Sequence, residues 1–121
     1  FKKTKKIKEI LYPYKPSSNS YKLWKKYYSG ANGLFSIVVK SKKKSSVVKF
    51  VNSLELFGIG YSWGGFESLA LLQDLRDDTK YTKTRKYFRF GKDEHIVRLH
   101  IGLEDPNDLV QDLKRSLRYV K

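Results

Sequence analysis

The sequence predicts an α/β two-layer sandwich, in which a small, mostly antiparallel sheet carries helices on one face. Three observations predict this fold. Short β-rich runs alternate with helical patterns, residues 95–102 alternate apolar and polar side chains, and an amphipathic helix with a clear N-cap follows them. At 121 residues, the chain has the length of one ordinary domain and can bury a core of its own.

The chain opens with a Lys-rich stretch to Leu11, which has the length of a short helix or strand. Prolines and serines over residues 13–20 then predict a loop. Trp24 and Tyr28 stand four residues apart, and this spacing indicates one or two helical turns over residues 21–28.

Residues 34–39 form a nearly continuous apolar, β-rich run, which predicts a strand covered on much of both faces. A helix is predicted next, capped by Ser45 or Ser46 and ending near Phe57 and Gly58. Its apolar positions follow the helical period and are Val47, Phe50, Val51 and Leu54.

Residues 60–65 are dense in glycine, which permits positive φ angles and lets another backbone or a ligand approach closely. A strand is predicted from Phe66 to Leu72. Residues 74–92 are charged and polar with a weak pattern, and we expect a long excursion there.

Residues 95–102 form the clearest strand pattern. One face carries Val97, Leu99 and Ile101, and the other carries Ile96, Arg98, His100 and Gly102. We expect the helices to cover the first face and the second to lack a cover within this chain. An arginine in an otherwise apolar strand, on such a face, indicates a functional cation. His100 is expected to be a packing residue rather than a catalytic one.

The last helix is predicted from its N-terminal signals. Asp105 is the expected N-cap, Pro106 takes the first helical position, and Asp108 lies three residues after the cap. The apolar stripe is expected to comprise Leu109, Val110, Leu113, Leu117 and Val120. This cap explains the Glu104-Asp105 pair better than acid–base catalysis does.

Composition excludes several classes of site. The chain has no Cys, which excludes disulfides, thiolate metal sites and a Cys nucleophile, and it has only two His. It has no apolar run of about 20 residues, so no membrane segment is expected. It begins at Phe1 and not at Met, so we expect it to be a piece of a longer protein.

The net charge of +14 suggests a polyanion such as nucleic acid as partner. The possible stacking platforms are Tyr12, Tyr14, Tyr21, Trp24, Tyr27 and Tyr28. The excess is mostly Lys, however, whereas base and phosphate recognition favours the Arg fork. No RNA-binding or zinc-finger motif appears either. A solvated Lys-rich surface is therefore the favoured interpretation.

Two motifs point to a known family. Residues 61–69 read Tyr-Ser-Trp-Gly-Gly-Phe-Glu-Ser-Leu, and residues 96–105 read Ile-Val-Arg-Leu-His-Ile-Gly-Leu-Glu-Asp. Together with the Gly-Leu-Phe-Ser sequence at 33–36, they resemble the C-terminal end of the Cys/Met-metabolism family of pyridoxal-phosphate (PLP) enzymes. The resemblance extends over nearly the whole chain. Within that family, Trp63 and His100 favour bacterial cystathionine β-lyase.

The resemblance implies that residues 1–121 are a single C-terminal domain of a larger cytoplasmic lyase subunit. The fold implied is the C-terminal small domain of fold-type I PLP enzymes. The family protein is a homo-oligomer that uses PLP, held by a large N-terminal domain, to cleave cystathionine to homocysteine, pyruvate and ammonia. Arg98 would clamp the substrate carboxylate, and Tyr61, Ser62 and Trp63 would support it from the Gly-rich loop.

The parts that hold PLP in the family are missing from this sequence. It contains no Gly-rich phosphate cradle before a helix and no family-type segment for the PLP lysine. The isolated chain is therefore expected neither to bind PLP productively nor to turn over substrate. The family often has a His-Pro pair where Tyr12-Pro13 stands, and the Lys density is unusual for it. The alternatives left open are a basic module that binds nucleic acid or other anions, and a remnant of a split, decaying lyase gene.

Overall fold

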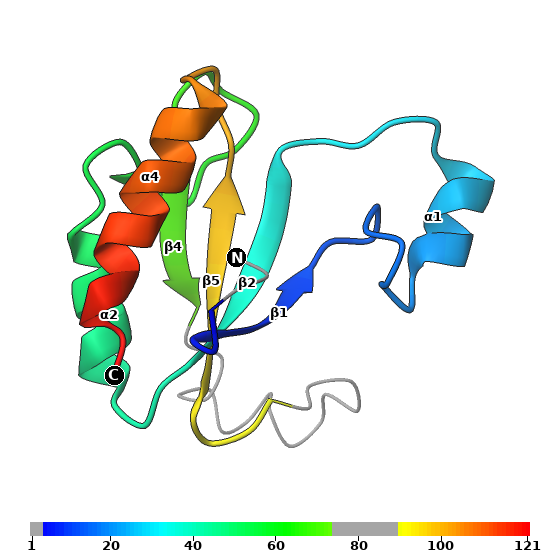
Figure 1. Ribbon diagram of the computed structural model, residues 1–121. Helices are drawn as coiled ribbons and strands as arrows, with labels where there is room; N and C mark the ends of the chain where they lie inside the picture. Colours follow the sequence, from blue (N-terminus) through cyan, green and yellow to red (C-terminus); the bar gives the residue numbers. More distant parts are fainter. Residues whose placement is uncertain (1–3, 74–89) are drawn as a thin grey trace.

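The computed structural model describes residues 4–73 and 90–121 and confirms the predicted fold class (Figure 1). The strands are β1 (Ile7–Leu11), β2 (Leu34–Lys40), β3 (Gly58–Ile59), β4 (Leu69–Gln73) and β5 (Glu94–His100). They form one sheet in the spatial order β1-β2-β5-β4-β3, in which only the β3–β4 pair is parallel among the described strands. The helices are α1 (Tyr21–Tyr27), α2 (Lys44–Asn52) and α4 (Pro106–Ser116), followed by the 3₁₀ turn η1 (Leu117–Tyr119). Most of the excursion expected at residues 74–92 lies outside the described residues.

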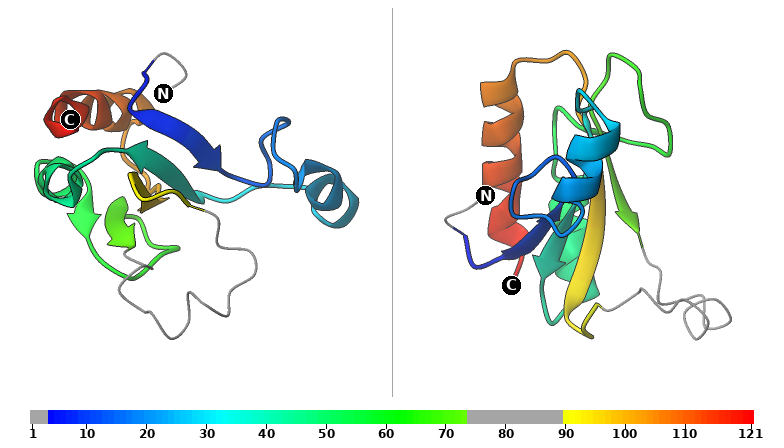
Figure 2. Two further views of the ribbon diagram at one scale, coloured as in Figure 1. Left: turned by 90° about the horizontal axis from the view of Figure 1, so that it is seen from below. Right: turned by 90° about the vertical axis from the view of Figure 1, so that its right-hand side faces the viewer.

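Helices α2 and α4 pack side by side on one face of the sheet, whereas α1 stands apart from it (Figure 2). Strand pairing sets Ile37 opposite Val97 and Phe35 opposite Leu99, so the central strands present matched apolar rows to the helices. Ile37, Val97 and Leu99 are fully buried in the core cluster, and Ile101 packs against it. The predicted core face of β5 is therefore confirmed.

Helix α4 begins as its sequence predicts. The Asp105 carboxylate accepts the backbone N–H groups of Asn107 and Asp108, with Pro106 in the first turn. Four of the five stripe residues are buried, but Val110 is 43% exposed. Its place in the stripe was wrong because consecutive residues lie about 100° apart around a helix, so Val110 turns away when Leu109 faces the core.

Helix α2 departs from its predicted ends. It begins at Lys44 after an N-cap at Lys43, and no side chain caps it, so the Ser45 or Ser46 cap was wrong. The Ser46 hydroxyl instead donates to the Lys43 carbonyl. The helix also ends at Asn52, well before Phe57.

The early end of α2 is explained by a carboxylate on α4. Asp112 is buried and accepts the backbone N–H groups of Glu55 and Leu56, while the Ser116 hydroxyl donates to the Ser53 carbonyl. These bonds hold residues 53–56 in a turn against α4. The side chains of α4 provide the hydrogen-bond partners that these backbone groups would otherwise have found within a longer α2. Arg115 pairs with Asp112 from the solvent side.

The second face of the sheet is not bare, contrary to the sequence-based expectation. Val38, Leu71, Ile96 and His100 are all buried there. For His100 the cover is the Gly-rich segment after β3, which folds back over the end of β5. The strand predicted from Phe66 begins only at Leu69, because this segment continues to Ser68. Among the described residues, no helix is long and apolar enough to cross a bilayer.

The Asp112 turn gives a stability prediction. The substitution Asp112→Ala removes the acceptor of two backbone N–H groups and the buried partner of Arg115, so we expect it to lower the free energy of unfolding by about 1–3 kcal/mol. The matched control, Asp108→Ala, removes an exposed acid from the first turn of the same helix and should cost about 1 kcal/mol or less. Urea unfolding of both variants measures the difference. Equal losses would contradict the role assigned to Asp112.

Candidate functional site

The site is built around the Gly-rich loop, which we define as residues 60–68 between β3 and β4. Gly64 adopts a φ of 83°, in the left-handed region that favours glycine. The large side chains of this loop point mostly to solvent, since Tyr61 is 80% exposed and Trp63 is 64% exposed. Packing of its own side chains therefore does not hold the loop in place.

Arg98 on β5 holds the start of the loop. Its Nη2 atom lies 2.6 Å from the Tyr61 carbonyl oxygen, 3.2 Å from that of Gly60 and 3.4 Å from that of Ser62. Arg98 is half-buried and stands between Ser36 on β2 and Leu71 on β4. A single guanidinium nitrogen thus gathers three consecutive carbonyl groups of the loop.

His100, two residues further along β5, holds the middle of the loop. Its Nε2 lies 3.0 Å from the Gly65 carbonyl oxygen, and the Gly64 N–H points at the same imidazole. The Gly64 N–H lies 3.2 Å from the same Nε2 and 3.5 Å from Nδ1, so the tautomer decides whether Nε2 donates to Gly65 or accepts from Gly64. The expectation that His100 is a packing residue is refined: it is buried, and its partners are backbone groups of the loop.

The end of the loop is fixed by a third contact set. Glu104 accepts the Ser68 N–H at 2.8 Å and the Ser68 hydroxyl at 2.7 Å. The Gly102 N–H donates to the Ser68 hydroxyl oxygen, and the Leu103 N–H donates to the Phe66 carbonyl. A Cβ on Gly102 would lie only 2.1 Å from the Phe66 carbonyl oxygen, so this close approach requires glycine.

These bonds lower the pKa of Glu104. Hydrogen bonds from the Ser68 backbone and side chain, in that order, stabilise the ionised carboxylate, and they outweigh the opposing effect of partial burial. Glu104 was grouped with Asp105 as part of the helix cap. The structure separates the two, because Asp105 caps α4 and Glu104 fastens the Gly-rich loop.

The structure brings two of the other three predicted site residues to Arg98, but through their backbones. Tyr61 and Ser62 offer carbonyl groups to Arg98, while their side chains are exposed. Trp63 follows directly in the loop with its ring largely in solvent. The contribution of Glu104 was missed; its signal in the sequence was the regular spacing of Arg98, His100, Gly102 and Glu104 at every second position.

Arg98 keeps donors available for a further partner. Within residues 4–73 and 90–121 its hydrogen bonds all come from Nη2, and it pairs with no carboxylate. Toward the other residues of these two ranges, Nη1 and Nε donate no hydrogen bond. A guanidinium with one side anchored and its charge not neutralised by a carboxylate suits the recognition of a carboxylate or phosphate group.

The described residues do not fit PLP as a covalently held cofactor. A lysine that forms a Schiff base needs a desolvated pocket that lowers its pKa, and none of the lysines in the described part of the chain is buried. No group of His, Asp or Glu in that part could hold a metal ion.

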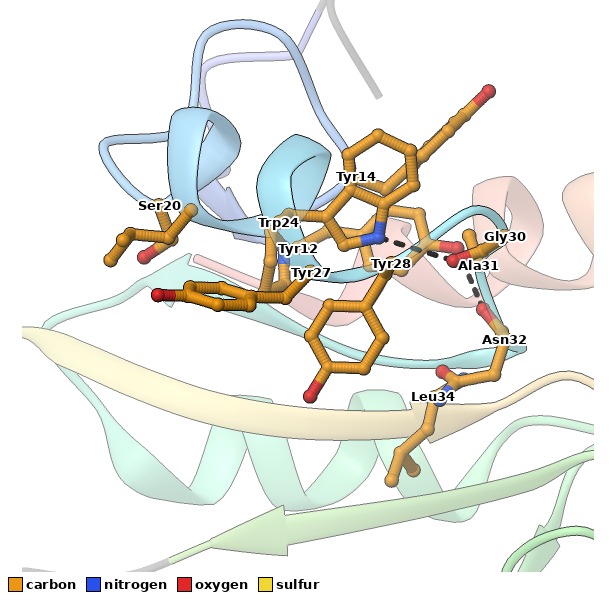
Figure 3. A pocket seen from close by; sticks show the side chains of 12 residues that line it. Tyr12, Tyr14, Ser20, Trp24, Tyr27, Tyr28, Gly30, Ala31, Asn32 and Leu34 are labelled. Carbon is orange, nitrogen blue, oxygen red and sulfur yellow. Dashed lines mark hydrogen bonds between the residues drawn. The ribbon is translucent and has the colours of Figure 1, made fainter.

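A hollow of about 420 Å³ lies elsewhere, between the end of β1 and the start of β2 (Figure 3). It is lined mainly by aromatic side chains, which are Tyr12, Tyr14, Trp24, Tyr27 and Tyr28. None of the residues of the Gly-rich loop and none of its β5 partners lines it. It is therefore a separate feature from the Arg98 site.

Comparison with known proteins agrees with the two motifs. The model of the family described as "Cys/Met metabolism PLP-dependent enzyme" matches residues 1–118. The chain is 40% identical over 114 residues to a putative cystathionine β-lyase of Rhizobium johnstonii and 39% identical over 111 residues to a cystathionine β-lyase of Bordetella avium. It is also 38% identical over 116 residues to an L-alanine/L-glutamate racemase of Wolbachia pipientis.

These alignments cover 91%, 92% and 95% of this chain but only 27%, 26% and 28% of the respective relatives. The chain thus spans little more than a quarter of their length and corresponds to their C-terminal portion. The fold agrees with a crystal structure of cystathionine γ-lyase from Lactobacillus plantarum, with a TM-score of 0.76 at 21% identity, over 98% of this chain and 30% of that one. The chain therefore belongs to the Cys/Met metabolism family of PLP-dependent enzymes, as a C-terminal portion of the family polypeptide.

Proposed function

We propose that this chain is the carboxylate-binding domain of an amino-acid-converting enzyme and that Arg98 clamps the α-carboxylate of the substrate. The observation that carries the proposal is the state of Arg98. Its Nη2 is anchored by loop carbonyls, and no carboxylate of the described chain neutralises its charge. The remaining donors, on Nη1 and Nε, can each form a charge-assisted N–H···O bond to a carboxylate oxygen. A pair of parallel bonds along one edge would include Nη2 and would replace one of its bonds to the loop carbonyls.

The Gly-rich loop would serve this clamp as a rigid support. Carbonyl groups at Nη2 hold the guanidinium plane in one orientation, so less side-chain entropy is lost when a ligand binds. The Ser62 carbonyl lies 3.4 Å from Arg98 Nη2, and Trp63 follows Ser62 in the loop. Both side chains are exposed, so we propose that they contact a bound substrate or a second domain. These roles for Ser62 and Trp63, and a neighbouring role for Tyr61, extend the same proposal.

The proposed reaction of the whole protein is β-cleavage of cystathionine to homocysteine, pyruvate and ammonia. Two relatives reported above are named as cystathionine β-lyases, one of them putatively, and Trp63 and His100 favour the same assignment within the family. The racemase relative acts on smaller amino acids by its name, and these share the α-carboxylate that Arg98 would bind. The clamp therefore serves either reaction.

PLP, when bound, withdraws electrons from the α-carbon of an amino acid and so makes its bonds easier to break. Because the residues described here do not fit it, we place its binding in a large N-terminal domain, absent from this chain. Residues 1–121 would then be one C-terminal domain of a lyase subunit that forms homo-oligomers in the cytoplasm. What this chain would contribute is the carboxylate clamp.

The first prediction concerns the isolated chain. Mixed with PLP and cystathionine, it should release no pyruvate and add no absorbance band to those of the same mixture without protein, because the described lysines are all at least partly solvated. Visible spectroscopy and a coupled pyruvate assay measure both. Catalytic pyruvate release accompanied by a new band would contradict the assignment of PLP binding to another domain.

The second prediction tests Arg98 in a fusion protein, in which this chain replaces the matching segment of the Bordetella avium enzyme. We expect Arg98→Ala to lower kcat/KM for cystathionine by about 100-fold or more, because the substrate loses its fixed tilt. Arg98→Lys should give a kcat/KM between those of the unsubstituted fusion protein and of Arg98→Ala, since lysine keeps the positive charge but lacks the planar guanidinium. Arg118→Ala is the matched control, because Arg118 is exposed and stacks on Tyr119. A folded fusion protein that forms no pyruvate, or that loses nothing on Arg98→Ala, would contradict the proposal.

The third prediction concerns pH and the loop. The folded-state pKa of Glu104 lies below its ordinary value of 4.5, so its stabilising effect is fully present above that value. It is lost as the pH falls through the lowered pKa. The protection factor of the Ser68 amide should therefore drop in acid, and Glu104→Gln should already show reduced protection at neutral pH. Hydrogen exchange followed by NMR measures this, and equal protection in both proteins at all pH values would refute it.

A further inference from the structure

The inference concerns the segment that joins β1 to β2, residues 12–33, which we call the arm. The arm leaves the sheet, carries α1 and returns, so that α1 stands clear of the α2–α4 layer (Figures 1 and 2). None of the seven residues of α1 is buried. A helix this short is not stable alone in water and normally depends on packing of an apolar face.

The arm has internal contacts that give it a defined shape. Tyr14 packs edge-on against Trp24 with ring centroids 4.7 Å apart, and Tyr21 stacks on Trp24 at 5.6 Å. The Trp24 Nε1–H donates to the Gly30 carbonyl, and the Tyr12 hydroxyl donates to the Asn32 carbonyl at 2.6 Å. These contacts use the inner rings and their polar edges, so the inner rings are structural.

The outer side chains of the arm remain in solvent. Tyr27 and Tyr28 are each 67% exposed and Leu23 is 61% exposed, and all three line the hollow shown in Figure 3. Exposed apolar groups gathered around a preformed hollow are typical of an interaction surface. The arm thus presents a shaped, unburied aromatic surface that its own domain does not use.

We propose that the arm is a docking surface for the cofactor-binding domain of the same enzyme, the part of the family polypeptide that this chain lacks. The length of the relatives supports this occupant, since about 70% or more of each lies outside the matched region. The proposal rests on the proposed function in assuming such a domain. It adds the surface on which that domain sits, which is distinct from the Arg98 site.

Charge favours this occupant over two others. The arm contains Lys15, Lys22, Lys25 and Lys26 and no acidic residue. A second copy of the chain would bring like charges together and is disfavoured. Nucleic acid is disfavoured because the arm has no Arg and its inner rings are committed to one another. The partner surface should therefore be apolar with an acidic rim.

Limited trypsin digestion tests the proposal, because α1 carries exposed cleavage sites at Lys22, Lys25 and Lys26. Mass spectrometry follows the rate of cleavage in the isolated chain and in the Bordetella fusion protein. We expect cleavage in the fusion protein to be about tenfold slower or more, since docking suppresses local opening. The double substitution Tyr27→Ser and Tyr28→Ser should restore fast cleavage. The control is Val110→Ser, which makes the same kind of change on the exposed face of α4 and should leave the protection intact.

Other outcomes decide against the proposal. Equal cleavage in the isolated chain and the fusion protein would overturn it. Protection of the isolated chain that grows with its concentration would identify a second copy as occupant, and protection by a single-stranded oligonucleotide alone would identify nucleic acid. Should the fusion protein not fold, the isolated chain is digested with the separately expressed remainder of the Bordetella enzyme, and absence of protection there counts equally against docking. The two proposals have separate readouts. Arm cleavage in the fusion protein tests docking, and the activity of the Arg98→Ala fusion protein tests the proposed function, so either proposal can fail while the other holds.

Discussion

The structure of the site depends on one constraint: the Gly-rich loop is held by side chains at alternate positions of one strand and its extension. Arg98 binds the carbonyls at the loop start, His100 binds its middle, and Glu104 fastens its end. A β-strand places every second side chain on one face at a spacing of about 6.5–7 Å, so Arg98 and His100 hold two successive points of the irregular loop. Glu104, in the bend that follows β5, holds a third. The loop needs no apolar packing of its own, and its aromatic side chains stay available.

The same constraint explains why the loop is rich in glycine and why Gly102 follows the strand. Carbonyl groups must turn toward Arg98 and then toward His100, and Gly64 makes this possible through its positive φ. Gly102 lets the Phe66 carbonyl come within reach of the Leu103 N–H. These glycines are therefore part of the site, although none of them carries chemistry.

Much of the fold could be predicted because its signals are local. The alternation at 95–102 and the Asp105 cap are properties of neighbouring residues, and both were confirmed. The errors lie where distant residues decide the outcome. Helix α2 ends early because Asp112, about sixty residues away, takes the N–H groups beyond it, and Ser68 joins the loop because Glu104 binds it. Arg98 could be singled out from its strand position, but its carbonyl partners could not, because every residue type has a backbone carbonyl and the sequence does not show which ones bind Arg98.

The central claim is that the Gly-rich loop and Arg98 hold each other through Nη2, and NMR of the arginine side chains in the isolated chain tests it most directly. An anchored guanidinium should rotate slowly about its Cζ–Nη2 bond, so the Nη2 protons of Arg98 should give separate, slowly exchanging signals. Arg98→Lys identifies these signals, and the same chain unfolded in urea provides the averaged reference. Averaged Nη signals for Arg98 in the folded chain, like those of the unfolded chain, would contradict the account, because the loop would then not be held by the strand.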